Sequence, residues 1–174
     1  MTGSASMATW RRIRWMQWCG AASVGFALVG FVAAGCTSSR RGGRSLPGEI
    51  LLLGIKGRSI EAELANDNIS RHTGLMYRKS MPENHGMLFV WPHSQMQAFW
   101  MKNTLLPLSI AFIDEKGTIL QIEDMQPQDE SMTRSKTMAR YALEVHQGWF
   151  RKNGIQSGDS IDDFAEKVRE SHDT

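Results

Sequence analysis

Cysteine is scarce in this chain, and it is missing from the part that carries most of the charge. The sequence of 174 residues has two cysteines, Cys19 and Cys36, and both precede residue 40. The rest of the chain therefore has no disulfide and no thiol nucleophile, which excludes cysteine catalysis and thiolate metal sites there. An apolar core of ordinary size has to stabilise the fold, and a chain of this length can provide one.

The sequence also lacks the short motifs that mark common active sites. It contains no HExxH zinc motif, EF-hand loop, phosphate-binding loop or serine-centred elbow. We therefore predict no catalytic residue, no metal ligand and no cofactor. A noncatalytic function is favoured, and whether the protein is an enzyme stays open.

Positive charge is in deficit after residue 45. Six of the twenty lysines and arginines precede residue 46, whereas all eighteen acidic residues follow it. The later part therefore has 14 basic and 18 acidic side chains, a net charge of 14 − 18 = −4. Nucleic-acid binding depends on basic side chains that neutralise phosphates, so we expect no nucleic-acid partner.

The N-terminal part has the order of an export signal. A basic cluster precedes residues 15–39, which carry no charge. The small residues before Cys36 resemble a lipobox, at which a bacterial signal peptide is cut and the new N-terminal cysteine is lipidated. We predict that residues 1–36 are a signal peptide with lipidation at Cys36. An uncut membrane anchor and cleavage to a free secreted protein are the alternatives.

Composition divides the rest of the chain into three segments. Residues 37–48 are rich in Ser, Arg and Gly and have few apolar residues, which predicts a flexible tether. Residues 49–165 carry the strand-like patterns of a β-rich domain, and residues 166–174 form a charged tail. With the leader, this organisation predicts a domain outside the cytoplasm, anchored to a membrane of the cell envelope.

Short strands dominate the predicted domain. They are expected at Ile50–Ile55, Ser59–Leu64, Gly86–Trp91, Ala98–Met101, Leu108–Ile113, Thr118–Glu123, Arg140–His146 and Ser160–Phe164. One helix is expected between Asn66 and Pro82, and a second at about Gln147–Asn153. The predicted fold is mainly β, a compact β-barrel or sandwich-like single domain with one or two short helices. Its predicted core consists of Phe89, Trp91, Phe99, Leu108, Ile110, Phe112, Ile119, Leu143 and Val145.

Four short motifs follow one another along the domain. They are Gly74-Leu75-Met76-Tyr77-Arg78, the run Gly86–Trp91, the run Phe99–Thr104 with Pro107-Leu108, and Leu143-Glu144-Val145 with Gly148. This pattern resembles the domain-of-unknown-function 192 family, also called uncharacterised protein family 0127, over about Ile50 to Ile161. The resemblance implies a β-rich fold, but it implies no particular activity because none is established for the family.

The polar residues Lys102, Asn103 and Thr104 interrupt an apolar run. An ammonium, a carboxamide and a hydroxyl at a strand end can bind an anionic or hydroxylated ligand, and the neighbouring Phe99 and Trp100 offer a stacking surface. Alternatively, Asn103 and Thr104 fix the backbone of a turn. We predict a candidate ligand site here and keep the turn as its alternative.

Glu144 stands between two apolar residues of a predicted strand. Strand alternation points it to the opposite face from Leu143 and Val145, and a buried carboxylate needs a partner. Arg78 and Lys102 are the expected partners, in a structural ion pair, and general acid or base catalysis and an exposed side chain are the alternatives. We therefore include Glu144 and Arg78 among the candidate ligand-binding residues.

These features together predict a protein of the cell envelope that binds a small ligand, an envelope polymer or another envelope protein. One alternative is a hydrolase-like envelope enzyme that uses Glu144 and Lys102. The other is a periplasmic Cu(I)-binding protein, since imidazole and thioether groups suit Cu(I) and Trp100 could cap such a site. The residues considered for copper are His72, His85, His93, His146, Met87, Met96 and Met101. Methionine that fills an apolar core explains much of this set without a metal.

Overall fold

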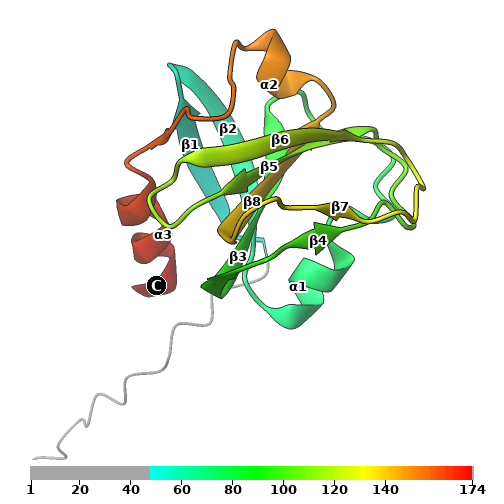
Figure 1. Cartoon of the computed structure of the whole chain (residues 1–174), viewed down its shortest axis with the longest axis horizontal. Coiled ribbons are helices and arrows are strands. Elements are labelled where there is room, and N and C mark those ends of the chain that lie inside the picture. Colours follow the sequence, from blue (N-terminus) through cyan, green and yellow to red (C-terminus); the bar gives the residue numbers. More distant parts are fainter. Residues whose placement is uncertain (1–47, 174) are drawn as a thin grey trace, which may run out of the picture. The chain divides into compact units, whose positions relative to one another are not determined.

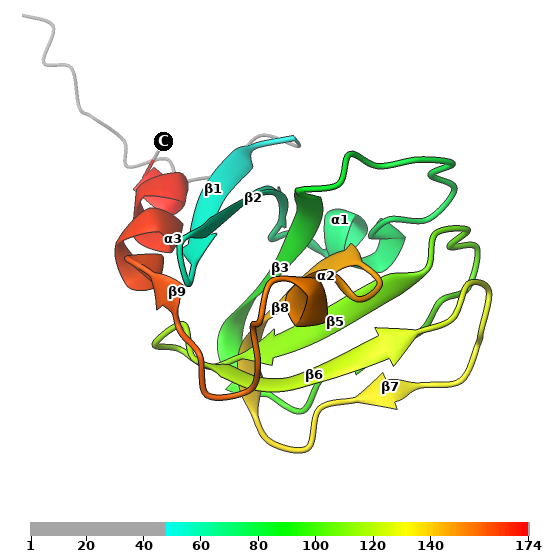
Figure 2. The ribbon, with the colours of Figure 1, turned by 90° about the horizontal axis from the view of Figure 1, so that it is seen from above.

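A computed structural model describes residues 48–173, which form a mainly β domain (Figure 1). Its strands are β1 (Ile50–Ile55), β2 (Arg58–Ala65), β3 (His85–Gln95), β4 (Ala98–Phe99), β5 (Leu108–Ile113), β6 (Ile119–Met125), β7 (Thr133–Arg134), β8 (Ala139–His146) and β9 (Ile161–Asp162). Its helices are α1 (Asn68–Thr73), α2 (Trp149–Lys152) and α3 (Phe164–Asp173). The predicted fold class is confirmed, because seven strands form a curled half-barrel and the helices are short (Figure 2).

Strand β8 lies in the middle of the large sheet, whose order is β6-β5-β8-β3-β2-β1-β9. It pairs antiparallel with β3 on one side and β5 on the other. Strands β2 and β3 pair in parallel and are joined by the crossover that contains α1. Strands β4 and β7 pair separately as a two-stranded arm.

The two faces of the large sheet bury different sets of side chains. On one face Leu143 and Val145 pack with Trp149 and Phe150 of α2 and with Phe164 of α3. We call this the sealed face, because helices α2 and α3 contribute buried side chains to it. Period-2 alternation along β8 turns Ala142 and Glu144 the other way.

That other side, which we call the pocket face, is covered by the β4–β7 arm and by the segment after α1. Leu75, Phe99 and Met101 from these segments pack on Phe89 and Phe112 of the sheet. Of the nine predicted core residues, eight are buried, and Trp91 is half-buried at the edge of this cluster. Both faces of the central strands are therefore covered.

Four predicted elements differ from the structure. The strand expected at Ser160–Phe164 is limited to β9, because Phe164 begins α3. The helix expected between Asn66 and Pro82 is limited to α1, because Gly74 has a φ of 49° and ends it. The strand expected at Ala98–Met101 is limited to β4. The charged tail expected from residue 166 is part of α3, whose Phe164 and Val168 are buried and join the core.

Nothing in the leader is described. The predicted signal peptide, Cys36 and the tether up to residue 47 lie outside the described residues. Within residues 48–173, no helix is long and apolar enough to cross a membrane.

Candidate functional site

A pocket opens on the pocket face between α1, β3, β8 and the segment around β4. Its volume is about 200 Å³, and its lining combines aromatic rings with a few polar groups. The lining residues are Arg71, His72, Thr73, Gly74, Leu75, Met76, Phe89, Trp91, Ala98, Phe99, Trp100, Thr104, Met132 and Glu144. Pockets that enclose drug-sized ligands measure roughly 300–1,000 Å³, so this one suits a small molecule or one group of a larger one.

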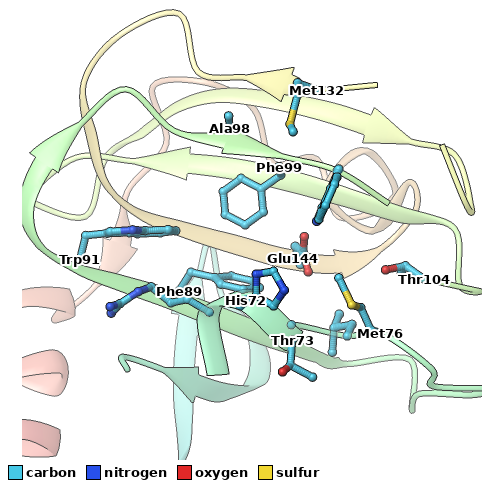
Figure 3. Close-up of a pocket in the computed structure, with 14 residues that line it drawn as sticks. His72, Thr73, Met76, Phe89, Trp91, Ala98, Phe99, Thr104, Met132 and Glu144 are labelled. Carbon is cyan, nitrogen blue, oxygen red and sulfur yellow. The ribbon is translucent and has the colours of Figure 1, made fainter. Parts of the chain in front are cut away.

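Glu144 lies at the floor of this pocket. Figure 3 shows its carboxylate on the Thr104 side of the Phe99 and Phe89 rings, with Trp91 beyond them at the other end. The residue is only 4% exposed. Strand β8 holds it there, since its backbone pairs with Met87 of β3 and Ile110 of β5, in the middle of the sheet.

The Glu144 carboxylate has no partner among residues 48–173. No hydrogen bond or ion pair of its side chain occurs there, and burial alone accounts for its electrostatics. Because no fully enclosed polar side-chain atom in this part of the chain lacks a hydrogen bond, the carboxylate oxygens must reach the open space of the pocket. Burial raises the pKa of Glu144 to about 8, since a low dielectric disfavours the charged form.

Aromatic rings form most of the apolar wall around Glu144. Phe99 packs edge-on against Phe89 and Trp91, with centroid distances of 5.0 and 5.8 Å, and Phe89 stacks on Trp91 at 6.2 Å. Arg71 lies over Trp91 at 5.8 Å from the ring centroid. These contacts hold the rings in place along the pocket lining.

The three residues of the predicted polar cluster occupy different places. Thr104 is buried and lines the pocket, where its hydroxyl donates to the carbonyl of Lys102 at 3.3 Å. Asn103 has a φ of 57° in a turn, and its amide donates to the Tyr77 hydroxyl at 2.9 Å. The Lys102 ammonium lies at the surface, 3.8 Å from Glu130 and 5.2 Å from the Trp100 ring centroid.

The predicted ion pair of Glu144 with Arg78 or Lys102 is wrong. Arg78 instead binds Glu63 of β2 through both of its terminal nitrogens, with Nη2 to Oε2 at 2.7 Å. This hydrogen-bonded pair lowers the pKa of Glu63 and raises that of Arg78. Of the predicted site residues, the pocket brings together Trp100, Thr104 and Glu144, whereas Lys102, Asn103 and Arg78 lie outside its lining.

Of the residues considered for copper, the pocket lining contains only His72. His72 lines the pocket together with Met76 and Met132, but His85 pairs with Glu61 at 3.1 Å and His146 contacts the Met81 carbonyl at 2.7 Å. Within residues 48–173 no group of three or more His, Cys, Asp or Glu side chains could hold a metal ion.

Several pocket residues were not predicted as site residues from the sequence. Phe89 and Trp91 were expected only in the core, whereas Phe99 was expected both in the core and as a stacking surface beside the polar cluster, and Met132 carries no signal in the sequence. Alternation along β3 could have placed Phe89 on the face of Glu144, because the neighbouring pair Met87 and Glu144 is in register. The approach of α1 and the β4–β7 arm could not be derived that way.

A close approach of β3 to β8 accompanies this arrangement. A Cβ atom on Gly86 would lie 2.3 Å from the Glu144 carbonyl oxygen, so a larger residue cannot stand there without a shift of the strands. At Gly74 a Cβ atom would lie 3.3 Å from the Phe89 ring, and the positive φ of this residue also favours glycine.

Comparison with known proteins identifies a family over nearly the same residues as the predicted β-rich domain, 49–165. The family model DUF192, described as "Uncharacterized ACR", matches residues 51–162. The chain belongs to the DUF192 family. No curated protein matches the chain.

Two crystal structures resemble this DUF192 protein. One, a candidate transcription regulator from Sinorhizobium meliloti 1021, is 36% identical with a TM-score of 0.63, over 70% of this chain and 97% of that one. The other, a protein of unknown function from Novosphingobium aromaticivorans DSM 12444, is 27% identical with a TM-score of 0.59, over 65% of this chain and 83% of that one. The family and these relatives leave the function unestablished.

Proposed function

We propose that this domain binds a small ligand, or one group of an envelope polymer or protein, in the pocket above Glu144. The observation that supports the proposal is a carboxyl group that is 4% exposed, lacks a partner in the described part of the chain and reaches the pocket. Buried polar groups of a scaffold are normally hydrogen-bonded, because an unmade bond is costly. A ligand would supply the missing partner.

The polar groups of the pocket suit binding better than catalysis. A hydrolase-like reaction with Glu144 and Lys102 needs both at one substrate, but Lys102 is at the surface beside Glu130. Glu144 shares the lining with His72 and Thr104, but the Thr104 hydroxyl donates to the Lys102 carbonyl and no hydrogen bond among the described residues joins it to a base. The Cu(I) alternative has His72, Met76 and Met132 on the pocket lining as possible soft ligands.

The stability of Glu144→Gln separates a binding site from a scaffold. At about pH 8.5, where the buried carboxyl of the wild-type chain is largely ionised, we expect the Gln variant to unfold at the same or a higher temperature. Glu123→Gln, a change on β6 outside the pocket lining, is the matched control. A clear loss of stability in Glu144→Gln alone would mean that the carboxyl supports the fold, and the proposal would fail.

We also propose that the domain works in the cell envelope, attached to a membrane through Cys36. The uncharged run at residues 15–39 and the small residues before Cys36 support this proposal. A fatty-acid probe fed to expressing cells should label the wild-type chain and not Cys36→Ser. If the Cys36→Ser variant is still labelled, the proposal that Cys36 is lipidated is wrong.

A nucleic-acid partner is not part of the proposal. The Sinorhizobium relative is described as a candidate transcription regulator, but residues 46–174 of this chain carry 14 basic and 18 acidic side chains. Binding to phosphates would have to overcome that net negative charge.

A further inference from the structure

The charge of the pocket indicates what kind of ligand it takes. Glu144 is the acidic residue of the lining, and the lining supplies no ion pair for it. Arg78 is bound to Glu63, and Lys102 lies beside Glu130. An anionic ligand would meet an unpaired carboxylate, whereas a cation would supply its missing charge.

Arg71 is the arginine of the lining, and its guanidinium is bound to other groups and does not pair with Glu144. Its guanidinium donates to the carbonyls of Asn66 and Val90 and to the Asn68 side chain, and it lies over Trp91. With His72 it completes the set of titratable groups on the lining. From β3 and β5, which flank Glu144, the residues paired with it are Met87 and Ile110, and neither titrates.

The walls also favour a cation over a neutral polyol. The negative π-faces of aromatic rings attract cations, and Phe89, Trp91, Phe99 and Trp100 all line the pocket. Two of these rings already have a cation of the protein over one face, Arg71 over Trp91 and Lys102 over Trp100. Polar acceptors are few, and the Thr104 hydroxyl already donates to the Lys102 carbonyl. A primary ammonium has three N–H donors that all need acceptors, whereas an alkylated ammonium presents mostly methyl groups to the rings.

We propose, on the basis of the ligand-binding function above, that the pocket takes an alkylated ammonium group, with its charge opposite Glu144 and its methyl groups against the aromatic rings. The volume of about 200 Å³ fits a head group of this kind, and the rest of the ligand extends through the open side of the pocket. Binding to the ionised form of Glu144 displaces its proton.

The test compares two probes of the same shape on the full chain in mild detergent, by isothermal titration calorimetry at about pH 7.5. Choline carries the quaternary ammonium, and 3,3-dimethylbutan-1-ol replaces its nitrogen with carbon. We expect choline to bind and the alcohol to bind at least about ten-fold more weakly, because the charge is lost. Glu144→Gln should weaken choline by a similar factor, and Glu123→Gln should not.

The pH dependence gives a second readout. Because Glu144 must lose its proton, choline affinity should rise by up to about ten-fold per pH unit below pH 8 and level off above it. The rise should persist in His72→Gln, which removes the imidazole of the lining.

Four results would overturn the inference. They are equal affinity for choline and the alcohol, no binding of choline, tighter binding of a primary amine such as butylamine, and binding of Cu(I) that is lost in His72→Gln. In each case the ligand-binding function stands as long as Glu144→Gln keeps or gains stability. If Glu144→Gln instead unfolds more easily, the binding function itself fails.

Discussion

The two faces of β8 show how one strand serves two purposes. On the sealed face Leu143 and Val145 are fully buried among apolar side chains. On the pocket face, one residue along, Glu144 is almost as deeply buried but is open to a pocket and has no partner in residues 48–173. The sealed face therefore stabilises the fold by apolar packing. The pocket face buries a carboxyl group without a partner, which costs stability but leaves that group free to contact a ligand.

Other buried polar residues sharpen the contrast. Gln97 donates to the Ala139 carbonyl at 3.0 Å, and its backbone N–H donates to the Ser135 hydroxyl at 2.8 Å. Ser109 donates to Asp124 and accepts from the Gly148 N–H. These polar groups join segments of the fold, whereas the Glu144 side chain joins none among the described residues. The difference in hydrogen bonding, rather than in burial, separates scaffold from candidate site.

The largest effect should come from the apolar part of the pocket face. Phe112→Ala removes a fully buried ring whose centroid lies 5.9 Å from that of Phe99. We therefore expect the free energy of unfolding to fall by about 3–5 kcal/mol. Leu143→Ala on the sealed face is the control and should cost about 2–5 kcal/mol. Denaturant melts measure both. A loss below about 1 kcal/mol for Phe112→Ala would show that the pocket face contributes little packing.

The next effect depends on pH and belongs to Glu144. Its pKa is raised to about 8 in the fold, so the folded state holds a proton that the unfolded chain releases near its ordinary value of 4.5. The stability of the wild-type chain should therefore fall as pH rises from 4.5 to 8, relative to Glu144→Gln, by roughly 1.4 kcal/mol per unit. Urea melts across this range measure it. Parallel curves for the two proteins would show that the carboxyl is not desolvated.

A smaller effect is expected at the ion pair outside the pocket. Arg78→Leu removes the partner that lowers the pKa of Glu63, and because the pair is partly exposed we expect a loss of about 1 kcal/mol at pH 7. The loss should start to shrink as the pH falls below about 4.5, where the unfolded chain takes up the proton, and should vanish only below the lowered pKa that Glu63 has in the fold. Lys79→Leu, an exposed neighbour, is the control. A loss that does not change with pH would point to packing by the Arg78 side chain instead.

The smallest effect should come from Lys102. Its side chain is 43% exposed, and its contacts with Glu130 and Trp100 are those of a surface group. We expect Lys102→Ala to change the unfolding free energy by less than about 0.5 kcal/mol and to leave choline affinity nearly unchanged. A loss of several kcal/mol would show that Lys102 supports the fold and is not merely a surface residue, in contrast to what its exposure indicates.

Sequence reasoning went furthest where local rules decide the outcome. The strands at Leu108–Ile113 and Arg140–His146 follow from runs of apolar residues, and β5 and β8 match them within one residue. Glu144 was placed opposite Leu143 and Val145 by alternation alone. The length of α1 was misjudged, because the break at Gly74 depends on a backbone angle that the apolar spacing does not reveal.

The sequence by itself determined the β-rich family fold, the family to which the chain belongs and the face of β8 that carries Glu144, because strand period and motif order are local properties. Only the tertiary structure decided which residues meet at that face. Arg78 pairs with Glu63 of β2, fifteen residues earlier in the chain, and the pocket draws its walls from α1, β3, β4 and β8. Contacts between segments distant in sequence depend on how the large sheet curls and where the β4–β7 arm packs. The spacing of residues along the chain does not predict either.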